Sequence, residues 1–217
     1  MKVKKYNLNN KKVQFLISSD EKLGKLIKYI KSCSIPIEDD DFKCIVKYII
    51  GQQISDKTRE SIWKKLCEKY QDISPETLNI ISDDELRSFG ICKQKITYIK
   101  NFSCAILNSQ FDLSAVKKLT NQEIRNELTK IKGIGNWTVE MYLIFSLGRE
   151  NVLSKGDYTI KRVLKWMYNL EKLPSNQDVE KYFSDWMPYS TIVSVYFWEA
   201  ISKGALSNSF DDLEKER

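Results

Sequence analysis

Apolar side chains recur at intervals of three and four residues along most of this chain, which is the spacing of one face of an α-helix. The segment 21–32 places Leu23, Leu26, Ile27 and Ile30 on one such face. Only 8 glycines and 4 prolines interrupt the 217 residues, and no segment alternates apolar and polar residues over a useful strand length. We therefore expect an all-α protein with roughly ten helices. They are expected at 21–32, 42–55, 56–70, 83–90, 93–107, 120–133, 136–147, 157–170, 176–186 and 189–204.

Histidine is absent from the sequence, and this removes Ser-His and Cys-His nucleophiles together with the commonest metal-ligating side chain. The cysteines form no C-x-x-C pair, so a zinc ribbon or an iron–sulfur cluster lacks a ligand framework. No metal bound by side chains is expected. If the chain is an enzyme, then carboxylates, lysines, tyrosines or a cofactor must carry its chemistry.

The balance of charge is basic, with a net charge of +6 and a pI near 8.9. Such an excess is compatible with a polyanionic partner, but many basic proteins have none. The apolar run 44–51 contains a lysine and is far shorter than a membrane span, and no apolar segment follows the basic start of the chain. We expect an intracellular, cytoplasmic protein. Only the polar ends, 1–10 and 209–217, have the composition of disordered segments.

Two glycines, Gly133 and Gly135, flank a single isoleucine between two expected helices. Gly133 suits the left-handed conformation that ends a helix, and Gly135 allows the backbone to come close to another molecule. The N–H groups that begin the following helix attract an anion, and Lys130 and Lys132 lie beside them. The pattern predicts a phosphate site, although a plain turn between two helices has the same pattern.

The segment LTKIKGIGNWTVEMYLIFSLG resembles the helix-hairpin-helix of the HhH-GPD DNA glycosylase superfamily, with the hairpin at about 121–147. That family pairs the hairpin with a catalytic aspartate a short way downstream. Asp157 matches this aspartate, 22 positions after Gly135 (157 minus 135). The segments FKCIVKYIIGQQIS and LRSFGICKQKITYIKNFS are similar to the same family, and WMPYSTIVSVYFW resembles its alkyl-base branch, the 3-methyladenine DNA glycosylase II type. The resemblance covers residues 20–204, in order.

The resemblance implies a catalytic role for Asp157, which also stands where an aspartate commonly caps a helix. Both roles are compatible, because a capping carboxylate is ionised and held in one direction. Cleavage of an N-glycosidic bond builds positive charge on the sugar, and a fixed carboxylate stabilises that charge and can orient the attacking water.

Trp137 occupies the position at which bifunctional relatives carry a nucleophilic lysine, so the resemblance implies a monofunctional enzyme that uses water. Trp137, Tyr158 and Trp198 match positions that line the base pocket of the alkyl-base branch, and Met141 stands where an aromatic residue is usual. Aromatic faces bind cations such as an alkylated purine. Packing in the protein core is the alternative for each of these rings.

Gln52 and Gln53 match the loop from which the family inserts a side chain into the minor groove, and Gln53 matches the inserted residue best. An exposed helix end is the alternative. We expect phosphate contacts from Gly133, Gly135, Lys132 and Thr138, with Lys93 and Lys95 as further candidates. In relatives, the hairpin also binds a monovalent cation through backbone carbonyls, and this is the only cofactor implied.

Two packed helical subdomains are expected, one at 41–149 and the other formed by 1–40 and 150–217, with Asp157 in a cleft between them. The N-terminal β-domain of longer relatives is not expected. The implied function is release of alkylated purines, such as 3-methyladenine and 7-methylguanine, from damaged double-stranded DNA by base flipping in base-excision repair, in the nucleoid if the source is prokaryotic. A glycosylase for an oxidised or deaminated base, a non-catalytic DNA-binding hairpin module and an unrelated helical interaction protein are the alternatives.

Overall fold

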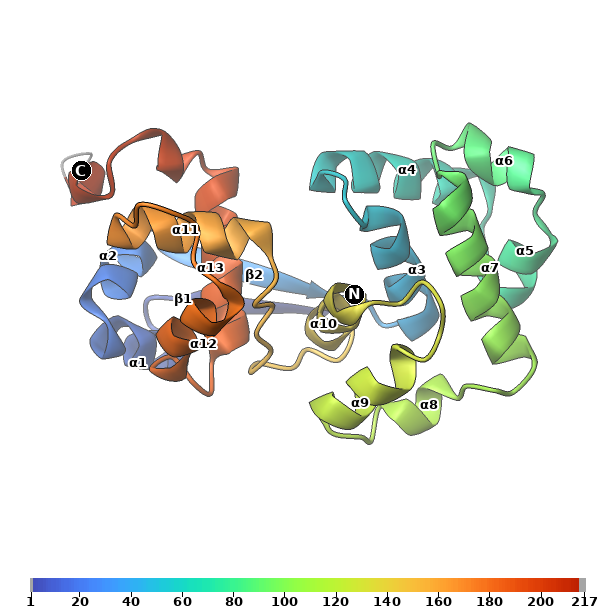
Figure 1. Cartoon of the computed structure of the whole chain (residues 1–217), viewed down its shortest axis with the longest axis horizontal. Coiled ribbons are helices and arrows are strands. Elements are labelled where there is room, and N and C mark those ends of the chain that lie inside the picture. Colours follow the sequence, from blue (N-terminus) through green and yellow to red (C-terminus); the bar gives the residue numbers. More distant parts are fainter. Residues whose placement is uncertain (1, 215–217) are drawn as a thin grey trace. The chain divides into compact units, whose positions relative to one another are not determined.

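A computed structural model describes residues 2–214 of the chain (Figure 1). Within this part of the chain there are thirteen α-helices, two β-strands and two short 3-10 helices. In chain order the elements are β1 (Lys2–Asn7), α1 (Lys11–Ser19), α2 (Glu21–Ile30), β2 (Ser32–Ile37), α3 (Asp41–Gly51), α4 (Asp56–Lys69), α5 (Pro75–Ile80), α6 (Asp83–Ser88), α7 (Lys93–Leu107), α8 (Leu113–Val116), α9 (Asn121–Leu128), α10 (Asn136–Phe145), α11 (Tyr158–Tyr168), α12 (Asn176–Ser184), α13 (Ser190–Ser202), η1 (Ala205–Ser207) and η2 (Phe210–Glu214).

The described residues divide into two compact units. One unit is Glu38–Leu147, and the other combines the residues up to Ile37 with those from Gly148 onward. The chain therefore begins in the unit that contains β1 and β2, leaves it after β2, and returns to it after α10.

The unit Glu38–Leu147 contains α3 to α10, and α3 packs against α4, α7 and α10 in its core. The rings of Phe42 and Phe102, from these two helices, stack with centroids 5.2 Å apart. Helix α7 also packs against α5 and α6 (Figure 1). At the start of α9, Thr120 and Glu123 form the reciprocal hydrogen bonds of a capping box, in which each side chain accepts from the other residue's backbone N–H.

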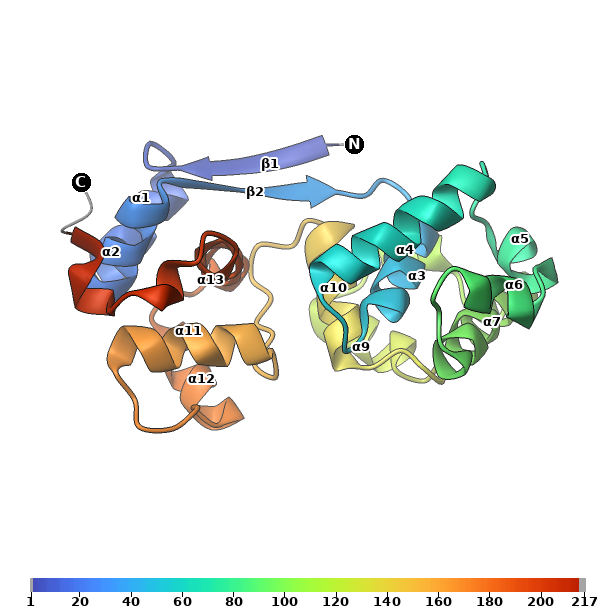
Figure 2. The ribbon, with the colours of Figure 1, turned by 90° about the horizontal axis from the view of Figure 1, so that it is seen from above.

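The other unit contains the antiparallel pair β1 and β2, in which Lys2 pairs with Ile37 and Asn7 with Ser32. The strands run side by side, and α13 packs against β2 as well as against α2 and α11 (Figure 2). Burial along β2 alternates, with Cys33, Ile35 and Ile37 facing the core. The helical fold class is confirmed, but the expectation that no strand forms is wrong, because β2 is a half-buried strand of only 6 residues.

The expectation for the two polar ends is also wrong within the described residues. The segment Lys2–Asn7 is strand β1, and the Tyr6 hydroxyl in it donates a hydrogen bond to Glu150 at 3.0 Å. At the other end, η2 buries Phe210 and Leu213. Residues 215–217 lie outside the described part of the chain.

Three helices were not expected from the sequence, namely α1, α5 and α8. The latter two have only 6 and 4 residues, so they show too few turns for a periodic pattern. Within residues 2–214, none of the helices has the length and apolar character that crossing a membrane requires.

Candidate active site and nucleic-acid interface

The turn between α9 and α10 contains two glycines with different requirements. Gly133 has φ +107°, and a Cβ atom built on it would lie 2.2 Å from Cγ of Tyr98 on α7. Only glycine fits there, because the backbone is left-handed and an aromatic ring covers it. Gly135 has extended backbone, and apart from its neighbours along the chain a Cβ on it would meet no atom of residues 2–214 within 4 Å. The protein's own packing therefore requires glycine at 133 but not at 135.

Gln52 joins the loop after α3 to this turn. Its Nε2 donates to the backbone oxygen of Gly133 at 2.9 Å and to Oγ1 of Thr138 at 3.0 Å. Thr138 is only 1% exposed, so its hydroxyl serves this internal contact. The structure therefore brings together three of the residues predicted to contact DNA, and it uses two of their side chains to hold the loop and the turn in place.

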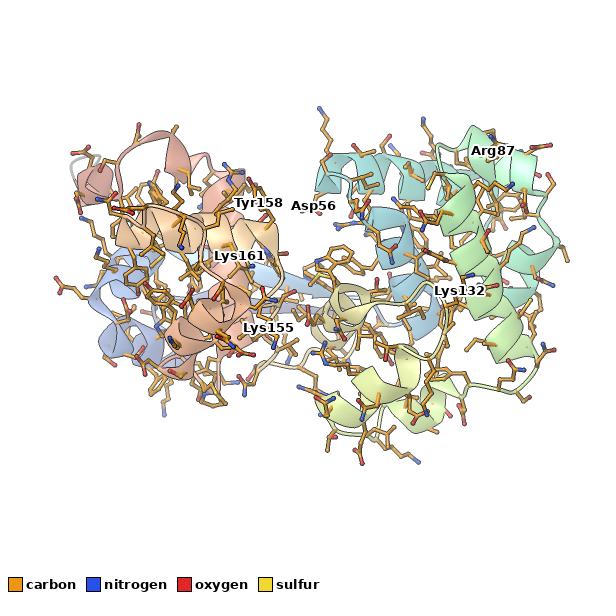
Figure 3. The ribbon with its side chains drawn as sticks, in the orientation of Figure 1. Asp56, Arg87, Lys132, Lys155, Tyr158 and Lys161 are labelled. Carbon is orange, nitrogen blue, oxygen red and sulfur yellow. The ribbon has the colours of Figure 1, made fainter. Side chains whose placement is uncertain are left out.

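The next residue, Gln53, is exposed and has left-handed backbone with φ +56°. Lys132 in the turn is also exposed (Figure 3), whereas Lys130 is paired with Glu127 at 2.7 Å. Lys95 donates from Nζ to the backbone oxygen of Ile50 at 2.7 Å, and burial lowers its pKa. Of the predicted phosphate-binding lysines, Lys132 and Lys93 are exposed and Lys95 is used inside the protein.

Trp137 is half-buried at the start of α10, and its ring meets the ring of Tyr48 edge-on at 5.9 Å. Tyr48 stacks on Phe145 at 5.3 Å, and the guanidinium carbon of Arg59 lies 4.8 Å from its ring centre. Burial raises the pKa of Tyr48 well above its ordinary value, although Arg59 acts in the other direction. The Tyr48 hydroxyl therefore stays protonated at neutral pH.

Arg59 is a nearly buried cation behind this aromatic pair. Its guanidinium forms ion pairs with Asp56 at 2.7 Å and with Glu60 at 3.0 Å. A Cβ on Gly51 would lie 2.6 Å from Cδ of Arg59, so the arginine packs directly against the end of α3. Sequence reasoning missed both Tyr48 and Arg59. The available signal was that Tyr48 lies four residues before Gln52, on the last turn of α3 that leads into the loop.

Met141, one turn after Trp137, is 3% exposed. The structure therefore places Met141 in the interior of the unit Glu38–Leu147.

Asp157 stands at the N-cap of α11, where its Oδ1 accepts a hydrogen bond from the backbone N–H of Ile160 at 3.0 Å. The backbone N–H of Asp157 donates to the oxygen of Ser154 at 2.9 Å, and Ser154 is fully buried. Hydrogen bonds thus fix both the side chain and the backbone of Asp157. The side chain is half-buried, and the hydrogen bonds of residues 2–214 leave Oδ2 without a partner.

Lys155, Tyr158 and Lys161 lie around the start of α11 (Figure 3). Lys155 is paired with Glu180 at 2.5 Å. Tyr158 is 64% exposed, with the guanidinium carbon of Arg162 at 5.9 Å from its ring centre. Trp198 is half-buried on α13, the helix that packs against α11.

Within residues 2–214, no group of three or more His, Cys, Asp or Glu side chains is placed to bind a metal, and the ligands predicted for a monovalent cation at the hairpin turn are backbone oxygens. The oxygens of Ile131 and Gly133 each accept one hydrogen bond, from Ile134 and from Gln52. A carbonyl oxygen has two lone pairs and suits a hard cation. The expectation of a cation stays a prediction.

A groove of about 890 Å³ lies at the far end of α11 from Asp157, and Tyr168, Pro174 and Tyr182 are among its lining residues. An α-helix rises about 1.5 Å per residue, so the length of α11 separates this groove from Asp157. It is not part of the candidate active site.

Residues 46–189 match the family described as HhH-GPD superfamily base excision DNA repair protein. The chain belongs to this superfamily. It also resembles an alkylbase DNA glycosidase-like protein of Schizosaccharomyces pombe, with 32% identity over 191 residues that cover 85% of this chain and 90% of that protein. The chain is thus a DNA glycosylase of base-excision repair, and its similarity lies with the 3-methyladenine glycosylase branch of the HhH-GPD superfamily.

Two solved structures share this fold over nearly their whole length. A DNA-3-methyladenine glycosidase from Bacillus halodurans superposes with a TM-score of 0.81 at 29% identity, covering 98% of this chain and 100% of that one. A 3-methyladenine DNA glycosylase from Schizosaccharomyces pombe, in complex with abasic DNA, gives a TM-score of 0.83 at 26% identity, covering 89% and 97%. The HhH-GPD glycosylase fold of the chain is therefore confirmed.

Proposed function

We propose that this HhH-GPD protein is a monofunctional glycosylase that hydrolyses the N-glycosidic bond of alkylated purines, such as 3-methyladenine and 7-methylguanine, in duplex DNA. The observation that carries the proposal is the fixed carboxylate of Asp157, of which Oδ1 caps α11 and Oδ2 remains for another partner. The match of Asp157 to the family's catalytic aspartate and the names of the two solved relatives support the same conclusion.

The reaction needs little acid catalysis, because alkylation at N3 or N7 already makes the purine cationic. The C1′–N bond breaks, and the bonding electrons leave with the purine, which becomes neutral. The sugar is left with positive charge, which the Asp157 carboxylate stabilises. A water attacks C1′ and gives up a proton, for which Asp157 is the acceptor. The products are the free base and an abasic site.

Trp137 determines that water is the nucleophile. Bifunctional relatives attack C1′ with a lysine at this position and then cleave the strand through a Schiff base. Indole has no basic nitrogen that could form this intermediate, so the strand stays intact after base release. Lys132 is the nearest amine in sequence that is exposed, but it belongs to the turn that we assign to phosphate binding.

Recognition of the base rests on aromatic rings. We propose that Trp137, Tyr158 and Trp198 bind the flipped base, since each cation–π contact contributes roughly 0.5–2 kcal/mol toward a cationic purine. An uncharged purine lacks this term, so the site selects the positively charged lesion. The Tyr48 ring behind Trp137 supports the orientation of the indole.

We assign binding of the DNA phosphates to the hairpin. Gly135 gives a phosphate close access to the N–H groups at the start of α10, and Lys132 adds an exposed positive charge. Gln53 is the residue that we propose enters the duplex in place of the flipped nucleotide, because its side chain is exposed whereas that of Gln52 is engaged.

The test is release of bases from duplex DNA that has been treated with a methylating agent. Wild type and Asp157→Asn are compared for free methylated purines and for strand breaks before and after alkali. Asparagine also caps helices well, so the variant should keep α11 intact. The matched control is Asp40→Asn, since Asp40 caps α3 through the Lys43 N–H at 3.0 Å in the same way.

We expect wild type and Asp40→Asn to release 3-methyladenine, and Asp157→Asn to release at least a hundredfold less while still binding DNA. Breaks should appear only after alkali. Equal release by Asp157→Asn would refute the role of Asp157. No release from methylated DNA, with release from duplexes that carry an oxidised or deaminated base, would favour the alternative glycosylase, and binding without release from either substrate would favour a non-catalytic hairpin module.

A further inference from the structure

Two segments that we assign to DNA binding, the loop after α3 and the hairpin turn, are joined by one side chain. Gln52 donates both hydrogens of its amide, to Gly133 O at 2.9 Å and to Thr138 Oγ1 at 3.0 Å. These partners are 81 and 86 positions away along the chain. Because an amide nitrogen has two hydrogens, the Gln52 nitrogen has none left for DNA.

Side chains of helix α7 contact both of these segments. Lys95 holds the end of α3 by donating to Ile50 O at 2.7 Å, and the Tyr98 ring covers Gly133. Asn101 makes a longer contact of 3.5 Å from Nδ2 to Lys132 O. These three side chains follow each other at intervals of three and share one face of the helix. The loop and the turn therefore rest on one rigid support, and Gln52 forms the direct bridge between them.

Gln53 follows the bridge immediately and is exposed with φ +56°. A left-handed backbone is unfavourable for glutamine, so neighbouring contacts must maintain it. Gln52 itself is held by its side-chain bridge and by a backbone hydrogen bond from its N–H to Ile49 O at 3.3 Å, and a weak backbone bond from Ile54 N to Gly51 O at 3.4 Å closes the turn. The position of the Gln53 side chain relative to the hairpin turn therefore depends on the contact that Gln52 makes.

We propose that Gln52 is a positioning residue, which couples phosphate binding at the hairpin to the insertion of Gln53 into the duplex. When the hairpin seats on the backbone, the bridge holds Gln53 at the position where it enters the base stack. Without the bridge, the hairpin still binds phosphate, but insertion is no longer favoured at the same time. This inference rests on the DNA-binding role proposed above.

The experiment uses the full chain and a duplex that carries a tetrahydrofuran abasic analogue, with 2-aminopurine opposite as a reporter of insertion. Affinity is measured for this duplex and for an intact duplex of the same sequence, so no catalytic turnover is needed. The variants are Gln52→Ala, Gln53→Ala and the double variant. Thr138→Val, which removes one acceptor with little change in volume, and Thr138→Ser, which restores the hydroxyl, form the second pair.

We expect Gln52→Ala to bind intact duplex within about twofold of wild type and to lose about tenfold of the preference for the abasic duplex, which corresponds to about 1.4 kcal/mol. Its 2-aminopurine signal should fall to that of Gln53→Ala. The double variant should be no worse than either single variant, since both act on one step. Thr138→Val should lose part of the preference, and Thr138→Ser should regain it.

Equal losses on intact and abasic duplex would overturn the inference, because they would mean that Gln52 only maintains the hairpin. An unchanged preference in Gln52→Ala, with wild type still preferring the abasic duplex, would overturn it while leaving the proposed function intact. If wild type itself fails to bind duplex, the proposed function fails and the inference fails with it, whereas wild type that binds without preferring the abasic duplex overturns the inference alone.

Discussion

Gly133→Ala tests whether the hairpin turn is fixed by the packing of the protein itself. The new Cβ would lie 2.2 Å from Cγ and 2.4 Å from Cβ of Tyr98, and the backbone at φ +107° is unfavourable for alanine. The left-handed conformation costs roughly 1–2 kcal/mol. Forcing a methyl group against a packed ring costs roughly 1–3 kcal/mol. We therefore expect a loss of about 2–5 kcal/mol in the free energy of unfolding.

The measurement is urea and thermal unfolding followed by circular dichroism. For a chain of this size each kcal/mol shifts Tm by about 2–4 °C, so Gly133→Ala should melt roughly 4–20 °C below wild type. Gly135→Ala is the matched control, since its Cβ would meet no atom within 4 Å. It should change the free energy of unfolding by less than about 1 kcal/mol. It should nevertheless weaken binding to intact duplex if a phosphate approaches this backbone.

A double-mutant cycle separates the two costs at position 133. Tyr98→Gly removes both the ring and the Cβ atom that the new methyl group would meet, so Gly133→Ala in that background should lose only the backbone cost, about 1–2 kcal/mol. The reasoning is refuted if Gly133→Ala unfolds within 0.5 kcal/mol of wild type. It is also refuted if the loss is the same with and without the Tyr98 ring.

Two further predictions concern Glu60 and Trp137. Burial acts to raise the pKa of Glu60, but the hydrogen bonds and charges of Lys47 and Arg59 outweigh it and leave this pKa below its ordinary value of 4.5. The stabilisation is therefore present above pH 4.5 and lost as the pH falls further. Glu60→Gln should lower the free energy of unfolding at pH 7 by up to about 1 kcal/mol, and this difference from wild type should shrink as urea unfolding is repeated at pH values progressively below 4.5. Trp137→Lys introduces an amine where bifunctional relatives have one, so it should give strand breaks without alkali and a borohydride-trapped protein–DNA adduct. Wild type should give neither product, and a trapped adduct with wild type would contradict the assigned role of the tryptophan.

The helical class of the fold and the details of the hairpin turn could be predicted because their causes are local. The capping box depends on Thr120 and Glu123, three residues apart, and the structure confirms it. The left-handed backbone at Gly133 was likewise predicted from a glycine that follows a helical segment, and it is observed. A capping box or a glycine at the end of a helix can be recognised from a few consecutive residues.

The strand pair escaped prediction because its cause is not local. Cys33, Ile35 and Ile37 alternate with polar residues or proline, but the run is 6 residues long and its partner β1 is mostly polar. The pair is held by ladder hydrogen bonds across an antiparallel register and by α13 beneath β2. Neither contribution can be seen in either segment alone, and a helix-rich background makes a short alternating run easy to overlook.

The same limit explains the roles of the two glutamines. Their sequence position predicted that both would face DNA, yet the amide of Gln52 is committed to Gly133 and Thr138 while Gln53 is exposed. Which of two adjacent polar residues turns inward depends on a partner more than 80 positions away, so spacing could not decide it. The inward residue orders the outward one before any DNA is bound. Ordering a loop on binding costs affinity, and a loop that the protein already holds avoids most of that cost. The unfavourable backbone of Gln53 is therefore best understood as strain that the Gln52 bridge maintains for insertion, and it should relax when the bridge is removed.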